Sequence, residues 1–139
     1  MYHIEEVLPD VNEYQMLRTA VGWASPSEAA CQPALDGTSF GVVARHAERI
    51  VGMGRLVGDA AMYSFIVDVV VHPDHQGAGL GRRMVDALVN WPNTHGIRTT
   101  LLIASSDVVP FYEPFGFTSD PSSVMKYAPD APTASDSTK

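Results

Sequence analysis

The chain has 139 residues, which is enough for one domain with a single hydrophobic core. Its net charge of −7 disfavours non-specific nucleic-acid binding, and no apolar run approaches the roughly 18 residues needed to cross a membrane. One cysteine, Cys31, excludes an internal disulfide, and the first residues lack a signal-peptide pattern, so a cytoplasmic location is the simplest interpretation. The acidic charge would steer cationic ligands such as amines, although solubility explains it equally well.

The sequence before residue 60 predicts two helices and three strands. Asp10 or Asn12 can cap the first helix, and Pro26 lies near the first turn of the second. A short polar link, His46-Ala47-Glu48, joins two strand patterns in a hairpin although it lacks Asn-Gly chemistry. The expected ranges are a strand at 3–8, a helix ending near 21, a helix beginning near 25, and strands at 40–45 and 49–56.

The centre of the chain joins a strand, a glycine turn and a helix. Residues 61–71 are largely apolar, which predicts a strand buried on both faces. Gly77, Gly79 and Gly81 follow a Pro-Asp break, and an amphipathic pattern predicts a helix from 79 to about 91. Glycines let the backbone approach an anion closely, and the free N–H groups of a helix N-terminus favour negative charge. This run therefore predicts a phosphate or pyrophosphate site.

The remaining residues predict the end of the sheet and a tail. We expect a buried strand at 99–104, a short helix at 110–115, a strand that begins at Phe117, and a closing strand at 124–127. The last residues are polar and contain proline, so they cannot bury enough apolar surface to offset the cost of ordering. The sequence thus predicts one domain at 1–128 and a disordered tail at 129–139.

The spacing of the glycines separates three kinds of phosphate site. A nucleoside-triphosphate loop needs a lysine directly after its glycines, and none is present. A dinucleotide fold needs Gly-x-Gly-x-x-Gly after its first strand, whereas this turn lies in the middle of the chain. The third pattern, Gln76-x-x-Gly79-x-Gly81, resembles motif A of the GNAT superfamily of N-acetyltransferases, which bind acetyl-CoA.

Other segments extend this resemblance over roughly residues 3–128. Residues 68–73 resemble the family strand that enters the cofactor loop, and residues 111–117 resemble its motif B, Phe-Tyr-Glu-x-x-Gly-Phe. Residues 52–59 and 14–23 resemble a strand and the first helix of small bacterial members. The resemblance implies an α/β (mixed α+β) fold, with a mixed central sheet of about six to seven strands and about four helices.

The resemblance also implies how acetyl-CoA is held. The backbone amides of the glycine turn would cradle the pyrophosphate, with added charge from Arg82 rather than Arg83, while strand residues contact the pantetheine arm. The N–H of Val69 is the expected group that polarises the acetyl carbonyl, and Ser105 stands where many members have an asparagine. The implied cofactor-binding residues are Val69, Val70, Val71, Gln76, Gly77, Ala78, Gly79, Leu80, Gly81, Arg82, Ser105 and Tyr112. No metal is expected.

Two catalytic residues are predicted. Tyr112 is the candidate general acid, because a phenol with a pKa of about 10 stays protonated at neutral pH and can donate to a leaving thiolate. Asp68 is the candidate base, acting through water; His72 and the absence of any dedicated base are the alternatives. Trp23 and Tyr63 are predicted to line the acceptor pocket, although such aromatic residues often belong to the core.

The sequence therefore predicts an N-acetyltransferase that moves the acetyl group of acetyl-CoA to a primary amine of a small molecule, by direct transfer in a ternary complex. An aralkylamine, a polyamine, an aminoglycoside-like compound and an amino acid all remain open as acceptors. The alternatives are acetylation of a protein N-terminus or lysine, and a non-catalytic acyl-CoA-binding module. By resemblance we expect a homodimer formed through the C-terminal strands, and neither nucleic acid nor membrane as a partner.

Overall fold

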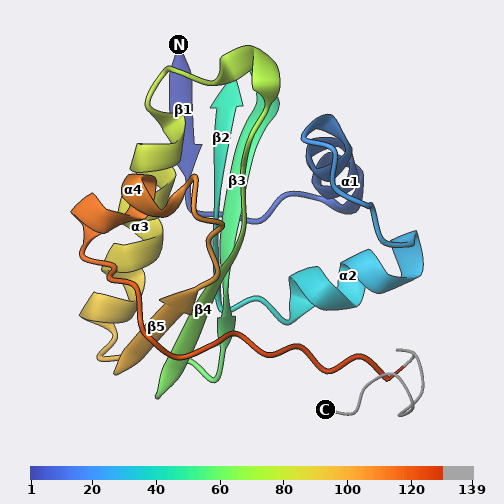
Figure 1. Ribbon diagram of the computed structural model, residues 1–139. Coiled ribbons are helices and arrows are strands. Elements are labelled where there is room, and N and C mark those ends of the chain that lie inside the picture. Colours follow the sequence, from blue (N-terminus) through green and yellow to red (C-terminus); the bar gives the residue numbers. More distant parts are fainter. Residues whose placement is uncertain (130–139) are drawn as a thin grey trace.

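The computed structural model describes residues 1–129, so the predicted tail at 129–139 lies, apart from its first residue, outside the described residues. The described chain forms a five-stranded mixed sheet with strand order β1-β2-β3-β4-β5 and four α-helices (Figure 1). The elements are β1 (Tyr2–Glu5), α1 (Val11–Ala20), α2 (Glu28–Asp36), β2 (Phe40–His46), β3 (Arg49–Gly58), β4 (Tyr63–Val71), η1 (Pro73–His75), α3 (Leu80–Thr94), β5 (Thr99–Leu102), α4 (Val109–Tyr112) and η2 (Glu113–Phe115). This architecture confirms the mixed α+β fold class.

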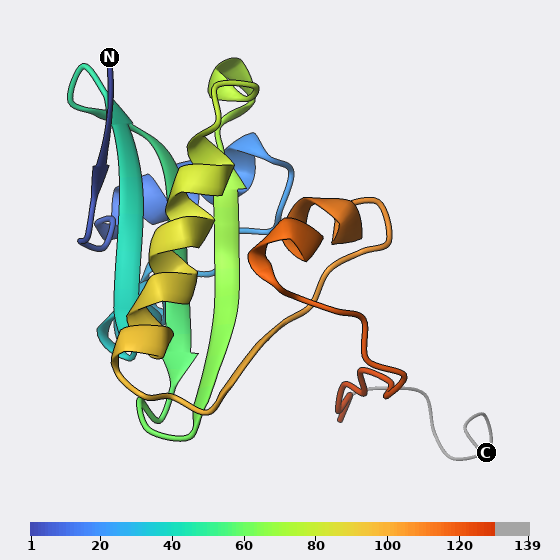
Figure 2. The ribbon, with the colours of Figure 1, turned by 90° about the vertical axis from the view of Figure 1, so that its left-hand side faces the viewer.

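The helices cover both faces of the sheet. Helices α1 and α2 lie on one face and α3 lies along the other, as Figures 1 and 2 show from two directions. Two apolar clusters fill the layers, and burial of their side chains is the main driving force for folding. The cluster under α1 and α2 includes Tyr14, Leu17, Cys31, Leu35, Val43, Ile50, Met53 and Val70. The cluster under α3 includes Val42, Ala44, Val51, Leu56, Ile66, Leu80, Met84 and Leu88.

Local chemistry fixes where the first two helices begin. Asp10 caps α1 in a capping box, in which its carboxylate accepts from the Glu13 N–H at 2.8 Å and the Glu13 side chain accepts from the Asp10 N–H at 3.0 Å. The Ser27 hydroxyl caps α2 by accepting from the Ala30 N–H at 3.2 Å. The predicted helix starts are thus confirmed, with Asp10 rather than Asn12 as the cap of α1.

The divergence of β4 and β5 creates the opening that the site uses. These two strands are parallel and pair only from Tyr63 with Thr99 to Ile66 with Leu102. β5 then ends, whereas β4 continues to Val71. Beyond Ile66, the edge of β4 that faces β5 therefore has no strand partner within residues 1–129.

The two strands predicted after η2 are wrong. Residues 117–129 contain no strand; Phe117 packs partly buried against the cluster under α3, but the later apolar side chains are exposed, with Met125 at 90% and Tyr127 at 86%. Pro121 lacks an N–H group, and the Asp120 carboxylate accepts from the Ser122 N–H at 2.7 Å, which favours a bend. The short apolar run at 124–127 buries too little surface to hold a strand, so the sheet has fewer strands than expected.

Candidate active site

The glycine turn presents open backbone groups at the start of α3. Gly79 precedes the helix with φ 80°, a left-handed conformation that favours glycine, and no side chain caps the helix. The Arg83 N–H donates to the Gly79 carbonyl at 3.2 Å, so the N–H groups that precede it lack an intrahelical partner. A Cβ atom at Gly77 or Gly79 would meet nothing within 4 Å, which means that the turn faces open space. The turn can therefore approach an anion with its backbone.

A hollow of about 290 Å³ at this turn adjoins a larger cavity of about 770 Å³, since Val71, Gln76, Gly81 and Phe111 line both. The smaller hollow is otherwise lined by Gly77, Gly79, Leu80 and Arg82. The larger cavity is otherwise lined by Trp23, Phe65, Ile66, Val67, Asp68, Val69, Leu102, Ile103, Ala104, Ser105, Val108 and Tyr112. Two neighbouring hollows thus extend from the helix N-terminus to the diverging strands.

Backbone groups of β4 face this space. The His72 N–H donates to the Val51 carbonyl on β3 at 2.8 Å. Because successive residues of a regular strand direct their amide groups to opposite sides, those of Val71 point away from β3. The Val71 carbonyl accepts from the Gln76 side-chain amide at 3.0 Å, which ties the strand end to the turn. The free edge of β4 can therefore pair with an extended ligand.

Tyr112 lies at the end of α4 and lines the larger cavity. Burial raises the pKa of its phenol above the usual value of 10.0, so the hydroxyl stays protonated at neutral pH. The ring packs edge-on against Phe111, with the centroids 4.9 Å apart. Phe111 in turn rests on Gly81, where an added Cβ would lie 3.3 Å from the Phe111 ring. This close approach holds α4 against the start of α3 and keeps the Tyr112 hydroxyl available as a proton donor.

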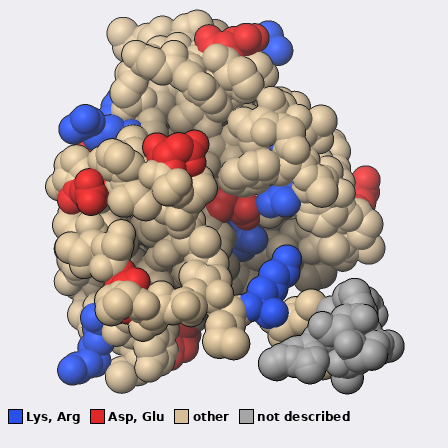
Figure 3. Space-filling view, in the orientation of Figure 1, with Lys and Arg blue, Asp and Glu red and all other residues tan. Residues whose placement is uncertain are grey.

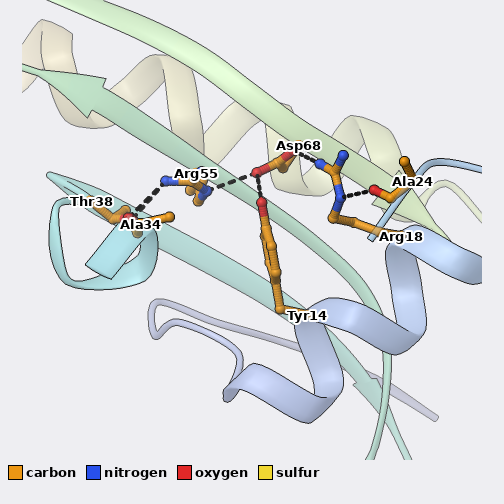
Figure 4. Close-up of polar contacts among 7 residues, drawn as sticks. All are labelled: Tyr14, Arg18, Ala24, Ala34, Thr38, Arg55 and Asp68. Atoms are coloured by element: carbon orange, nitrogen blue, oxygen red, sulfur yellow. Dashed lines mark hydrogen bonds and ion pairs between the residues drawn. The ribbon is translucent and has the colours of Figure 1, made fainter. Parts of the chain in front are cut away.

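Asp68 stands at a bulge in β4, where Asp68 and Val69 lie opposite Gly54 alone and Asp68 has φ 56°. Its carboxylate is 10% exposed and binds three partners (Figure 4). One oxygen accepts from the Tyr14 hydroxyl at 2.7 Å and from Arg55 Nε at 2.8 Å. The other oxygen accepts from Arg18 Nη1 at 2.9 Å. The bulge therefore turns this carboxylate into a charged network built from α1 and β3.

Tyr14 supports this network from the first helix. Burial, and then its hydrogen bond to Asp68, raise the pKa of its phenol, so the group stays neutral. Arg55 also donates through Nη1 to the Ala34 carbonyl and the Thr38 hydroxyl, each at 3.1 Å. Figure 3, drawn in the orientation of Figure 1, shows basic and acidic side chains next to one another in the hollow at the middle of the molecule.

The structure brings most of the predicted site residues to one space. Val70 is an exception: it is 2% exposed and packs in the core under α1, so its side chain does not reach the cavity. Tyr63 lies at the opposite end of β4 and pairs with Thr99, outside the lining of the cavity. Ala78 belongs to the turn but lines neither hollow. Ser105 does line the larger cavity, and its hydroxyl donates to Asp107 at 2.6 Å.

Sequence reasoning missed Tyr14, Arg18 and Arg55 as parts of the site. Tyr14 lies within the predicted first helix, and the available signal was that a buried tyrosine hydroxyl needs a hydrogen-bond partner. Nothing in the local pattern of either arginine marks it, because the partner of each is far away along the chain. Phe111 lines both hollows and was assigned only to a family motif.

Residues 1–129 contain neither a metal-binding cluster nor a membrane-spanning helix. No group of three or more histidine, cysteine, aspartate or glutamate side chains is placed to hold a metal ion in this part of the chain. Within the same residues, no helix combines the length and apolar character required to span a bilayer.

The mixed sheet with diverging strands and a glycine turn before α3 is an architecture found in acetyltransferases of known structure. The family model of the acetyltransferase (GNAT) domain matches residues 7–127, so the chain belongs to the GNAT acetyltransferases. A probable acetyltransferase of unknown function from meticillin-resistant Staphylococcus aureus has a similar structure, with TM-score 0.82, 26% identity, and coverage of 92% of this chain and 98% of that one.

Two relatives are similar in sequence. The uncharacterized N-acetyltransferase ycf52 of Pyropia yezoensis is 34% identical over 116 residues, which cover 81% of this chain and 67% of the relative. The histone acetyltransferase TAP1 of Glycine max is 32% identical over 126 residues, which cover 83% of this chain and 54% of the relative. The chain thus spans about two thirds of the first relative and about half of the second. Like its relatives, it is an acetyl-transfer enzyme.

Proposed function

We propose that the chain transfers the acetyl group of acetyl-CoA to a primary amine of a small molecule, by direct transfer in a ternary complex. The observation that carries this proposal is the single cavity in which the free edge of β4, the Tyr112 hydroxyl, Trp23 and Asp68 meet. Direct transfer requires a donor, an acceptor and a proton donor in one space, because proximity and orientation supply much of the rate enhancement.

The residues present fit acetyl-CoA. The uncapped start of α3 and the open space at Gly77 and Gly79 suit a pyrophosphate, and Arg82 lines the same hollow. The backbone groups of Val69 and Val71 suit the amide groups of a pantetheine arm. When bound, acetyl-CoA supplies an activated acetyl thioester and a thiolate leaving group.

The chemistry then needs few side chains. A bond forms between the amine nitrogen and the acetyl carbonyl carbon, while the carbon–sulfur bond breaks. The Val69 N–H polarises the carbonyl oxygen, and the Tyr112 hydroxyl gives its proton to the departing thiolate sulfur. The amine loses a proton to water.

Asp68 acts in this proposal as a positioning residue rather than as the base. Two guanidinium groups and one phenol donate to its carboxylate, so both carboxylate oxygens are already engaged by side chains of α1 and β3. This geometry suits a structural role better than proton transfer from an amine. Asp68 holds the acceptor wall of the cavity in place instead.

Protein acetylation is the second candidate, favoured by the name of the soybean relative, a histone acetyltransferase. The cavity favours a small acceptor, because the Trp23 side and the α4 side both belong to its lining and enclose it between them. A non-catalytic acyl-CoA-binding module is the third candidate, and the buried phenol of Tyr112 argues against it, since binding alone needs no proton donor at that place.

We also propose a homodimer in the cytoplasm. The outer edge of β5 and the segment that follows η2 expose apolar side chains, including Leu101 at 54% and Met125 at 90%. Unpaired strand edges associate readily with another chain. The buried free thiol of Cys31 suits a reducing compartment. Sedimentation equilibrium tests the dimer, and a monomer over the whole concentration range would contradict it.

The proposed function is tested by calorimetric titration of acetyl-CoA together with thiol release across a panel of amines. We expect saturable binding and thiol release that depends on a small amine. Release that depends only on histone peptides would favour protein acetylation, and binding without release from any amine or peptide would favour the binding module.

A further inference from the structure

We infer that Arg18 binds an anionic group of the acceptor, so that the substrate is an amine that also carries a carboxylate or a phosphate. This inference rests on the proposed function, because it names the acceptor class for the same cavity. It gives Arg18 the role of a specificity-determining residue.

Arg18 lies between two residues that line the cavity. It projects from the last turn of α1, and its Nη1 donates to Asp68 at 2.9 Å. Its guanidinium carbon lies 5.4 Å from the centre of the Trp23 ring, a distance at which a cation is attracted to an aromatic face. Asp68 and Trp23 both line the larger cavity. Arg18 is not itself a lining residue, but its guanidinium is in contact with two residues of the wall where an acceptor would lie.

Arg18 has N–H donors that its contacts within residues 1–129 do not use. A guanidinium carries five N–H groups, of which the contacts within residues 1–129 use the one on Nη1 to Asp68 and the one on Nε to the Ala24 carbonyl at 2.9 Å. Figure 4 shows the remaining terminal nitrogen of Arg18 turned away from both partners. Within residues 1–129, Ser64 Oγ is the sole fully buried side-chain polar atom without a partner, so Arg18 Nη2 keeps some exposed surface. A planar carboxylate or phosphate matches such donors.

The local charge has the opposite sign to that of the whole chain. Two guanidiniums, those of Arg18 and Arg55, share the single Asp68 carboxylate, which leaves one net positive charge. Tyr14 adds no charge because its phenol is neutral. All three charged side chains are largely buried, at 21%, 12% and 10% exposure for Arg18, Arg55 and Asp68. A net charge in such a place attracts a counter-ion more strongly than one in open solvent.

The two arginines have different roles. Arg55 uses Nε for Asp68 and Nη1 for Ala34 and Thr38, so it anchors the carboxylate to the end of α2. Arg18 is the more exposed of the two and stands beside Trp23. The excess positive charge is thus presented at Arg18. Polyamines and aminoglycoside-like compounds carry several positive charges and are disfavoured there, whereas amino acids and phosphorylated amines are favoured.

The test compares acceptors that differ in the anionic group. Phenylalanine is compared with phenylalaninamide, which has the same shape without the charge, and phosphoethanolamine with ethanolamine. Each compound is titrated calorimetrically into the wild-type chain saturated with CoA, and kcat/KM is measured with acetyl-CoA. We expect the anionic member of at least one pair to bind and react about tenfold better or more, as for a hydrogen bond to a charged group. The pair that shows the preference identifies carboxylate or phosphate.

Arg18→Gln and Arg45→Gln are the matched variants. Arg45 has the same 21% exposure and pairs with Glu13 at 2.9 Å, but it lies on β2, and its partners are Glu5, Glu13 and Glu48 rather than the cavity-lining Asp68 and Trp23. Arg18→Gln should bring the anionic-to-neutral ratio to about one, while Arg45→Gln should keep the wild-type ratio. Thermal unfolding checks that both variants fold, and the ratio is read on the folded fraction.

The outcomes separate this inference from the proposed function. Equal or better binding of the neutral members, or no detectable binding of either pair, overturns the role of Arg18, even if other amines release thiol from acetyl-CoA. A preference that survives Arg18→Gln also overturns it. Preferential binding of an anionic amine without any turnover supports the acceptor site but contradicts the proposed transfer.

Discussion

The two walls of the cavity are built in different ways. The cofactor wall comes from one continuous stretch, residues 69–82, and presents mainly backbone groups. The acceptor wall includes Asp68, which is held from behind by side chains far apart in the sequence, Tyr14, Arg18 and Arg55. Backbone recognition tolerates many side chains, whereas the charged network depends on each of its members.

The largest expected effect is a fall in kcat without a change in acetyl-CoA affinity. Tyr112→Phe removes the proton donor but keeps the ring that packs on Phe111, so kcat should fall by about 10² to 10⁴ with acetyl-CoA affinity unchanged. Steady-state rates and calorimetry measure the two quantities. Tyr127→Phe, at a side chain that is 86% exposed, is the matched control and should have no effect. An unchanged kcat in Tyr112→Phe would exclude the assigned role.

The next effect lies on the acceptor wall. Asp68→Asn leaves two guanidiniums without their shared counter-charge, and we expect a loss of roughly 3 kcal/mol in the free energy of unfolding. Urea denaturation measures it. Asp74→Asn changes a carboxylate that is 83% exposed and should cost less than about 0.5 kcal/mol. A stable Asp68→Asn chain that loses activity would restore Asp68 as the base.

A smaller effect is expected on the cofactor wall. Gly79 and Gly96 both have positive φ, at 80° and 71°, and both face open space, but only Gly79 belongs to the cofactor hollow. Gly79→Ala and Gly96→Ala should each lower stability by about 1 kcal/mol. Only Gly79→Ala should weaken acetyl-CoA binding, by about tenfold, because its Cβ enters the space that the anion needs. Equal affinities in both variants would show that the turn does not hold the cofactor.

Removing one hydroxyl from the network should have an effect of similar size. Tyr14→Phe deletes the donor that lies 2.7 Å from Asp68 and leaves the ring in place, so the free energy of unfolding should fall by about 1.5 kcal/mol. Chemical denaturation of the variant measures this change. Because both arginines remain, the preference for an anionic acceptor should persist, and its disappearance would mean that the phenol rather than the charge orients the acceptor.

The smallest effect concerns pH. Burial raises the pKa of Tyr112 above 10.0, so the phenol keeps its proton as pH rises through the neutral range and loses it only above that value. The kcat of the wild type should therefore show no loss assignable to this group up to about pH 9.5. A pH profile of kcat at saturating substrates measures it. A loss of kcat near pH 8 that is absent from Tyr112→Phe would contradict the raised pKa of Tyr112.

The cofactor wall and the acceptor wall also differ in how well the sequence predicts them. The strand, turn and helix of residues 61–91 depend on neighbouring residues, and the structure confirms them, although α3 continues to Thr94 with Pro92 in its last turn. The acceptor wall depends on a bulge at Asp68, where φ is 56°. No local sequence pattern predicts this bulge. The apolar residues at 124–127 have the pattern of a strand, but residue type alone could not show whether they would be buried or exposed in the fold.

The most direct test of the account follows free thiol and product mass when the wild-type chain is given acetyl-CoA with and without a small amine. The account predicts thiol release only with the amine, an equal amount of singly acetylated amine, and an enzyme of unchanged mass. Thiol release at the same rate without any amine, or a chain that first becomes acetylated and then passes the group on, would contradict direct transfer in this cavity.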